Sequence, residues 1–134
     1  MRLRSLLVAA LASLALAPGA FAEDPPKVVY ERYTSALRAR DADRIAQRLS
    51  RASRDKMLAD SAEMRQKLLE LIAALLPMSI RIAGTDVGPD AASASLVLTG
   101  ASPEDGTPMY GRVDLVKEEG DWKIDRESWS NTPP

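Results

Sequence analysis

The hydrophobic pattern of the chain changes at Pro77, and this change divides the sequence into a helical part and a strand part. Before Pro77, apolar residues recur every three or four positions, which is the period of a helix with one buried face. After Pro77 they alternate with polar residues, as in strands with one face in the core. The pattern therefore predicts an α+β domain in which helices pack on one side of an antiparallel sheet.

Three helices are predicted before Pro77. The first covers about residues 25–39, because Asp24 precedes two prolines that suit the first helical positions. The second follows Asp41, a possible N-cap, and residues 50–60 remain ambiguous. The third runs from about residue 61 to residue 76, and one of its faces carries Met64, Leu68, Leu71, Ile72 and Leu75. This last helix is apolar almost all round, which indicates deep burial or a partner on its other side.

Four strands are predicted beyond Pro77, and they follow one another as a meander. Gly120 is expected to take a positive φ in the turn before the last strand. The expected strands cover residues 78–83, 92–99, 109–116 and 122–124. We expect one domain over residues 23–130 and a disordered tail over 131–134.

The first 22 residues have the features of a secretory signal peptide. Arg2 and Arg4 precede an eleven-residue apolar run, Leu6–Leu16, and the segment ends in Ala20-Phe21-Ala22, an A-x-A cleavage site. The sequence thus predicts a periplasmic or secreted protein that is cleaved after Ala22. No cysteine follows the apolar run, so we do not expect a lipoprotein.

The composition excludes several classes of chemistry. The chain of 134 residues contains no histidine and no cysteine, so it cannot build a disulfide framework, a histidine-ligated metal site or a Ser-His-Asp triad. The formal net charge of −1 gives no reason to expect a nucleic-acid partner. No acidic cluster has the spacing of a calcium loop. We therefore predict no metal and no cofactor.

The closing segment resembles a known superfamily. Residues 111–125, which read GRVDLVKEEGDWKID, and the preceding order of helices are similar to small bacterial exported domains of the nuclear-transport-factor-2-like superfamily. Members of this superfamily include SnoaL-like and lumazine-binding-like proteins. The resemblance implies a cone-shaped, cystatin-like fold in which a curved four-stranded sheet wraps around helices. It also implies a pocket at the open end in many members, and dimerisation through the sheet in some.

Within this cone, a pocket for a small apolar ligand would be lined by apolar and aromatic side chains. Core filling is the competing role for each of them. The candidates are Tyr33, Leu37, Leu71, Ile82, Leu96 and Trp122.

No catalytic residue is predicted. Enzymes of the superfamily use an acid or base inside the cone, and the nearest candidate here is the Tyr110, Arg112 and Asp114 face of the third strand. That face is opposite to the apolar one, so the three side chains are expected to point outward. We expect no ionisable group inside the cone, and Arg81 and Asp86 are the nearest to it.

A basic stripe is the remaining surface signal. If the second helix starts near Asp41, then Arg44, Arg48 and Arg51 line one exposed stripe. Such a stripe is most often only a solvated face, but it also suits an anionic surface, which would mean at most peripheral membrane contact.

Taken together, the sequence predicts a non-catalytic exported protein that binds a small apolar ligand or a protein partner. Two alternatives stay open. One is a small isomerase-like or cyclase-like enzyme with a carboxylate inside the cone. The other is a dimeric structural component of the cell envelope that binds no ligand.

Overall fold

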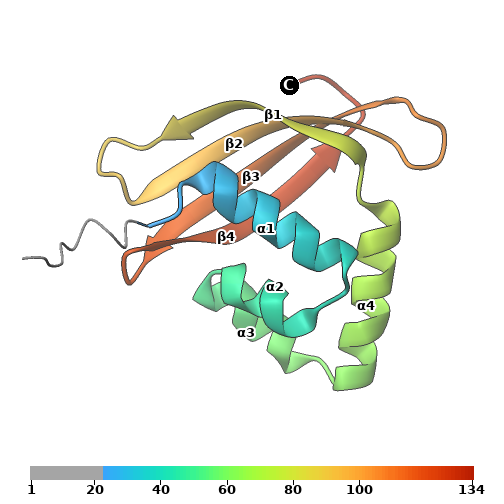
Figure 1. The fold of residues 1–134 in the computed structure, drawn as a ribbon, viewed down its shortest axis with the longest axis horizontal. Coiled ribbons are helices and arrows are strands. Elements are labelled where there is room, and N and C mark those ends of the chain that lie inside the picture. Colours follow the sequence, from blue (N-terminus) through green and yellow to red (C-terminus); the bar gives the residue numbers. More distant parts are fainter. Residues whose placement is uncertain (1–22) are drawn as a thin grey trace, which may run out of the picture.

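The structure, a computed structural model, describes residues 23–134, and the predicted signal peptide lies outside this range. Four helices precede a four-stranded antiparallel sheet, which confirms the α+β class (Figure 1). The elements are α1 (Pro26–Arg38), α2 (Ala42–Arg48), α3 (Arg51–Ala59), α4 (Ala62–Leu75), β1 (Met78–Val87), β2 (Ser93–Ala101), β3 (Pro108–Glu118) and β4 (Asp121–Ser130).

The prediction of three helices was wrong by one, because the ambiguous segment 50–60 forms α3. The Ser50 hydroxyl caps this helix by accepting a hydrogen bond from the Ser53 backbone N–H at 3.2 Å. No residue of α3 is fully buried. The helix therefore lacks the apolar stripe by which the sequence would have revealed it.

The sheet is a simple meander in the order β1-β2-β3-β4, with every neighbouring pair antiparallel. A two-residue turn joins β3 to β4, and both Glu119 and Gly120 have positive φ. This geometry confirms the expectation for Gly120 and suits the right-handed twist of the strands. Residues 131–134 follow β4 as an exposed segment without regular structure.

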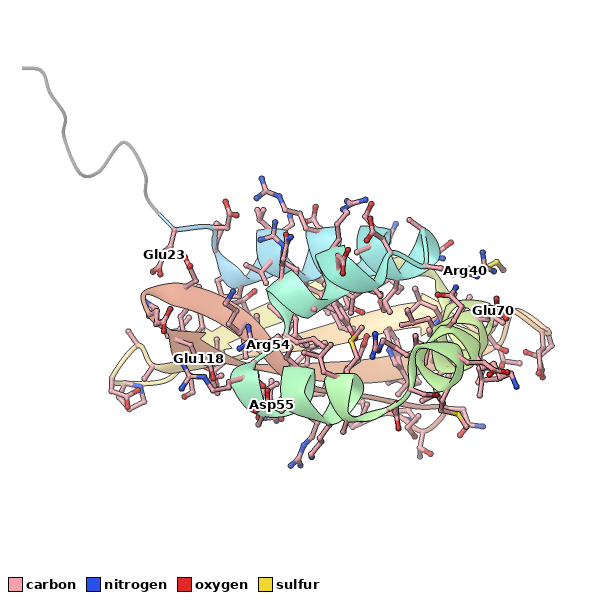
Figure 2. The ribbon with its side chains drawn as sticks, turned by 90° about the horizontal axis from the view of Figure 1, so that it is seen from below. Glu23, Arg40, Arg54, Asp55, Glu70 and Glu118 are labelled. Carbon is pink, nitrogen blue, oxygen red and sulfur yellow. The ribbon has the colours of Figure 1, made fainter. Side chains whose placement is uncertain are left out.

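The helices lie on one side of the curved sheet, and α1 runs across it (Figure 1). Figure 2, seen from the helical side, shows the outer faces of α3 and α4 with Asp55 and Glu70 directed away from the sheet. The core forms between α1 and the sheet, from side chains that are at most 9% exposed. They include Val29, Tyr30, Tyr33, Ala36, Leu37, Leu96, Leu98, Val113, Leu115, Trp122 and Ile124.

Helix α4 is much less buried than its apolar sequence suggests. Only Leu69 is buried within the helix, at 4% exposure, whereas the predicted face is exposed. The side chains of Leu71 and Leu75, for example, are 55% and 54% exposed. The helix touches α1 but stands away from the sheet (Figure 1). Of the two expectations for this helix, deep burial is therefore wrong. No helix within residues 23–134 is long and apolar enough to cross a membrane.

A β-bulge at Asp125 reverses the direction of the side chains along β4. Leu115 pairs with Ile124, but the next residue of β3, Asp114, pairs with Arg126, so Asp125 is the extra residue. Trp122 and Ile124 face inward before the bulge. Beyond it, the inward positions are Glu127, which is opposite the buried Val113, and Trp129, which is opposite Gly111.

The junction of α2 and α3 holds this bulge in place. The Ser50 backbone N–H donates to the Ile124 carbonyl at 2.7 Å. The Ser50 hydroxyl donates to Asp125 Oδ1 at 2.8 Å, and the Ser53 hydroxyl donates to the Asp125 carbonyl at 2.7 Å. The extra residue thus has partners for both its side chain and its backbone, as a buried polar group requires.

Gly111 makes room for the indole ring of Trp129. A Cβ atom at position 111 would come within 2.7 Å of the Trp129 ring. The ring therefore lies flat on the backbone of β3, a position that only glycine allows. A Cβ atom at Gly84, in contrast, would meet nothing within 4 Å.

Substitution of Gly111 tests this packing. We expect Gly111→Ala to lower the free energy of unfolding by about 1–3 kcal/mol, because the added methyl group overpacks the contact with Trp129. Gly84→Ala is the matched control, and it should change stability by less than about 0.5 kcal/mol. Urea denaturation of both variants is the measurement. Equal stabilities would show that the Trp129 ring does not lie on Gly111.

Candidate functional site

A cavity of about 660 Å³ opens between the inner face of the sheet and helices α3 and α4. Its walls are largely apolar and come from both halves of the chain. The apolar wall residues are Leu49, Ile72, Leu75, Leu76, Met109 and Ile124. The cavity exists because α4 stands away from the sheet and leaves the end of β4 uncovered. A concave, mostly apolar cavity with a few polar groups is the usual form of a small-molecule site.

Glu127 is the central polar group of the cavity wall. Its Oε2 atom accepts two hydrogen bonds, from the Tyr30 hydroxyl at 2.6 Å and from the Trp129 indole N–H at 3.0 Å. Its Oε1 atom accepts no hydrogen bond from the described residues. Since no fully buried side-chain oxygen in this part of the chain lacks a partner, Oε1 is not fully enclosed, and Glu127 is one of the residues that line the cavity. The carboxyl group is therefore fixed on one side and open on the other.

The surroundings of Glu127 change its acidity. Burial raises the pKa of this carboxyl above its ordinary value, and the hydrogen bonds from Tyr30 and Trp129 oppose that rise only in part. The pKa of Tyr30 is also raised, first by burial and then by the nearby Glu127 carboxylate. The Tyr30 hydroxyl therefore stays protonated at physiological pH and donates its hydrogen bond to Glu127.

Tyr33 supplies a second polar group. Its side chain is 9% exposed and lines the cavity, and its ring centroid lies 6.2 Å from that of Tyr30. Its hydroxyl has no hydrogen-bond partner among residues 23–134 and is not fully enclosed. Burial, with Glu127 nearby, raises the pKa of Tyr33, so the hydroxyl stays protonated. It is available to a ligand as donor or acceptor.

The expectation that no ionisable group lies inside the cone was wrong, because Glu127 lines the cavity. The two candidates named from the sequence, Arg81 and Asp86, are exposed and lie outside this cavity. Sequence reasoning missed Glu127 because the bulge at Asp125 reverses the strand's alternation. The segment around it, Asp125-Arg-Glu-Ser-Trp129, has no apolar alternation that would reveal the change.

The outward face of β3 agrees with expectation. Arg112 is exposed, and its guanidinium donates to Asp114 Oδ1 at 2.9 Å and to the Ser95 hydroxyl at 3.1 Å. Tyr110 belongs to the same outward face and does not line the main cavity. This group therefore lies outside the candidate site.

The structure brings only some of the predicted pocket residues to the cavity. Tyr33 lines it. Leu71 does not, because it lies on the exposed side of α4, and its neighbour Ile72 takes the position expected for it. A one-residue step on a helix rotates the side chain by about 100°, which accounts for the difference.

The other predicted pocket residues lie elsewhere. Leu37 and Leu96 are at most 1% exposed and fill the core. Ile82 is half-buried against the core and borders a separate hollow near Tyr30. Trp122 is buried, as expected, but at the opposite end of β4, where the Lys117 ammonium lies 4.7 Å from its ring centroid.

The predicted arginine stripe is interrupted. Helix α2 ends at Arg48, so Arg51 begins a different helix from Arg44 and Arg48. Arg48 lies 3.9 Å from an Asp24 carboxylate oxygen, and the Arg51 guanidinium lies 3.4 Å from Glu119. Arg44, Arg48 and Arg51 therefore do not form a continuous free basic face. This geometry gives little support to binding of an anionic surface.

No group of three or more potential ligands within residues 23–134 could hold a metal ion. Asp105, which lies in the loop before β3, accepts hydrogen bonds from the Thr107 backbone N–H and hydroxyl, which hold its pKa below the usual value. That carboxylate stabilises the loop, as turn aspartates commonly do.

Comparisons with known proteins support the fold and no more. No protein-family model matches the sequence, and no curated protein matches it. The solution structure of a SEC-C motif-containing protein from Rhodopseudomonas palustris is similar, with a TM-score of 0.57 and 14% identity over 77% of each chain. A crystal structure of a de novo designed protein with a curved β-sheet has a TM-score of 0.47 at 14% identity, covering 77% of this chain and 96% of that one. Such likeness says nothing of function.

Glu127 should give stability a characteristic pH dependence. Its folded-state pKa is raised, so the folded chain holds the proton more tightly than the unfolded chain does. In the unfolded chain, a glutamate has a pKa of about 4.3. The contribution of neutral Glu127 to stability is complete below that pH. It is lost as the pH rises through the raised folded-state value.

Urea denaturation between about pH 4 and pH 8 measures this effect. We expect the free energy of unfolding of the unmodified chain, relative to Glu127→Gln, to fall as the pH rises and then to level off. If the free energies of unfolding of the two proteins changed in parallel with pH, the Glu127 carboxyl would not be buried.

Proposed function

We propose that residues 23–134 form an exported binding protein that holds a small, largely apolar molecule in the cavity between the sheet and α4. The observation that carries this proposal is the cavity of about 660 Å³, with largely apolar walls and Glu127 among its wall residues. Its volume lies in the range of about 300–1,000 Å³ that is usual for small-molecule sites.

The arrangement of the walls supports selective binding. Apolar side chains such as Ile72 and Met109 would contribute affinity by burying the body of the ligand. Glu127 and the Tyr33 hydroxyl would orient the ligand through hydrogen bonds. Because Tyr30 and Trp129 already fix the carboxyl group, the Glu127 side chain would lose little conformational freedom on binding.

We also propose that the domain has the cone-shaped fold implied by the sequence resemblance. A curved four-stranded sheet with helices on its inner side and a cavity at one end fits the cone of the nuclear-transport-factor-2-like superfamily. The export of the protein rests on the signal-like sequence of residues 1–22. We therefore place the binding function in the periplasm or outside the cell.

Proton transfer is a second candidate function, and Glu127 is the observation that favours it. A carboxyl group with a raised pKa inside an apolar cavity is suited to general acid–base catalysis. The Tyr33 hydroxyl would supply a hydrogen bond to a developing oxyanion. Binding remains the simpler proposal, since it requires only the groups that the cavity holds and no particular reaction.

We also propose that a second copy of the chain covers the outer face of α4. Met64, Leu68 and Leu71 follow one another at spacings of four and three residues, which is the pattern of helices that pair. In an antiparallel pair, Leu68 would lie opposite Leu71 of the second copy. The outer face of the sheet, through which the resemblance implies dimerisation in some members, offers fewer large apolar side chains, among them Val97.

Filling the cavity tests the binding proposal. We expect the fluorescence of the neutral dye N-phenyl-1-naphthylamine to increase when the dye binds the mature chain, residues 23–134, because the dye enters an apolar site. Ile72→Trp should weaken this binding about tenfold or more, because the larger ring occupies the cavity. Gln66→Trp, on an exposed position of the same helix, is the control and should bind like the unmodified chain. Equal binding by both variants would place the fluorophore elsewhere.

Light scattering tests the association through α4. We expect the mature chain to form a dimer that Leu71→Glu converts to a monomer. The new carboxylate would be buried in the interface, and the loss of its hydration would destabilise the dimer. Val97→Glu places the same charge on the outer face of the sheet and should leave the dimer intact. A monomer at every concentration, or a dimer broken only by Val97→Glu, contradicts the proposal.

A further inference from the structure

We infer that the ligand of this cavity is an organic cation, an amine or ammonium group on an apolar body of small-molecule size. The inference rests on the proposed binding function and adds the chemical class of the ligand. Three features of the cavity carry it: an open carboxylate oxygen, aromatic rings beside it, and a wall in which acidic residues outnumber basic ones.

The open carboxylate oxygen provides the charge. Two donors, the Tyr30 hydroxyl and the Trp129 indole N–H, both bind Oε2 of Glu127, whereas Oε1 has no hydrogen bond from residues 23–134 and is not fully enclosed. These donors stabilise the ionised form and keep the group from turning. An ammonium N–H that met Oε1 would form a charge-assisted hydrogen bond, which is stronger than one between neutral groups.

The aromatic rings provide a surface that attracts cations. One face of the Trp129 indole lies on the backbone at Gly111, so the part that lines the cavity is the opposite face and the outer edge. Tyr33 is a second aromatic wall residue. The faces of such rings carry partial negative charge and attract organic cations most strongly where water is excluded. A carboxylate beside two aromatic rings is therefore complementary to an ammonium group.

The charges around the cavity act in the same direction. Its wall includes the acidic residues Glu104, Asp125 and Glu127 and one basic residue, Arg126, which is exposed. Arg38, the basic residue that influences the nearby Tyr30, donates a hydrogen bond to the Pro77 carbonyl at 3.1 Å. An anionic ligand, such as a fatty acid, would place its charge beside Glu127, in a wall that holds three acidic residues and a single, exposed arginine. The wall thus selects against anions as well as for cations.

A matched series of ligands tests the inference. Octylamine, octan-1-ol and octanoate share one apolar chain and differ only in the charge of the head group. Isothermal titration of the mature chain at neutral pH should show octylamine binding about tenfold or more tightly than octan-1-ol, as a charge-assisted contact predicts. Octanoate should bind more weakly than octan-1-ol.

Two variants identify the group responsible. Glu127→Gln keeps the shape of the side chain and should reduce octylamine binding to the level of octan-1-ol, with octan-1-ol itself unchanged. Asp114→Asn removes a carboxylate from the outer face of the same sheet and should leave all three affinities as they are. Circular dichroism checks that both variants fold.

The outcomes separate this inference from the binding proposal. If octan-1-ol binds and octylamine binds no more tightly, or if Glu127→Gln retains the preference, the cation inference is overturned and the binding proposal stands. If none of the three compounds binds, both are overturned.

Discussion

The candidate site depends on one irregularity in the sheet, the β-bulge at Asp125. Without the extra residue, β4 would continue its alternation, and Arg126 and Ser128 would face the helices in place of Glu127 and Trp129. Hydrogen bonds from Ser50 and Ser53 hold the bulge from the helical side. The α2–α3 junction, whose Leu49 and Ser50 are buried, therefore helps to determine which side chains enter the cavity.

Several local features become consistent once the bulge is in place. The inward Trp129 needs a flat surface, and Gly111 on the neighbouring strand provides it. The inward Glu127 needs donors, and these come from the Trp129 indole and from Tyr30 on α1. Burying the carboxyl group without these donors would lower the stability of the fold by roughly several kcal/mol. Core packing and the site thus use the same side chains, so a variant that disturbs one will affect the other.

The sequence predicted the regular parts of this fold and not its irregular parts. Periodicity located the boundary at Pro77, the first three strands, the start of β4 and the turn at Gly120, because each leaves a repeating or conformational signal. It missed the part of β4 beyond Ile124, which continues to Ser130. It did not reveal α3, which has no fully buried residue, or the exposure of α4, which depends on how far the helix stands from the sheet. Tyr33 was predicted as a pocket residue, but Glu127 was not, since a bulge changes the alternation without leaving a sequence pattern.

The most direct test of this account is the titration of Glu127 itself, followed by carbon-13 NMR of its side-chain carboxyl in the mature chain. We predict a midpoint above the ordinary value of a glutamate, with the Trp129 indole N–H signal shifting at the same pH, because the two groups share a hydrogen bond. An ordinary or lowered midpoint, with a Trp129 signal that does not respond, would show that Glu127 is neither buried nor bound to Trp129.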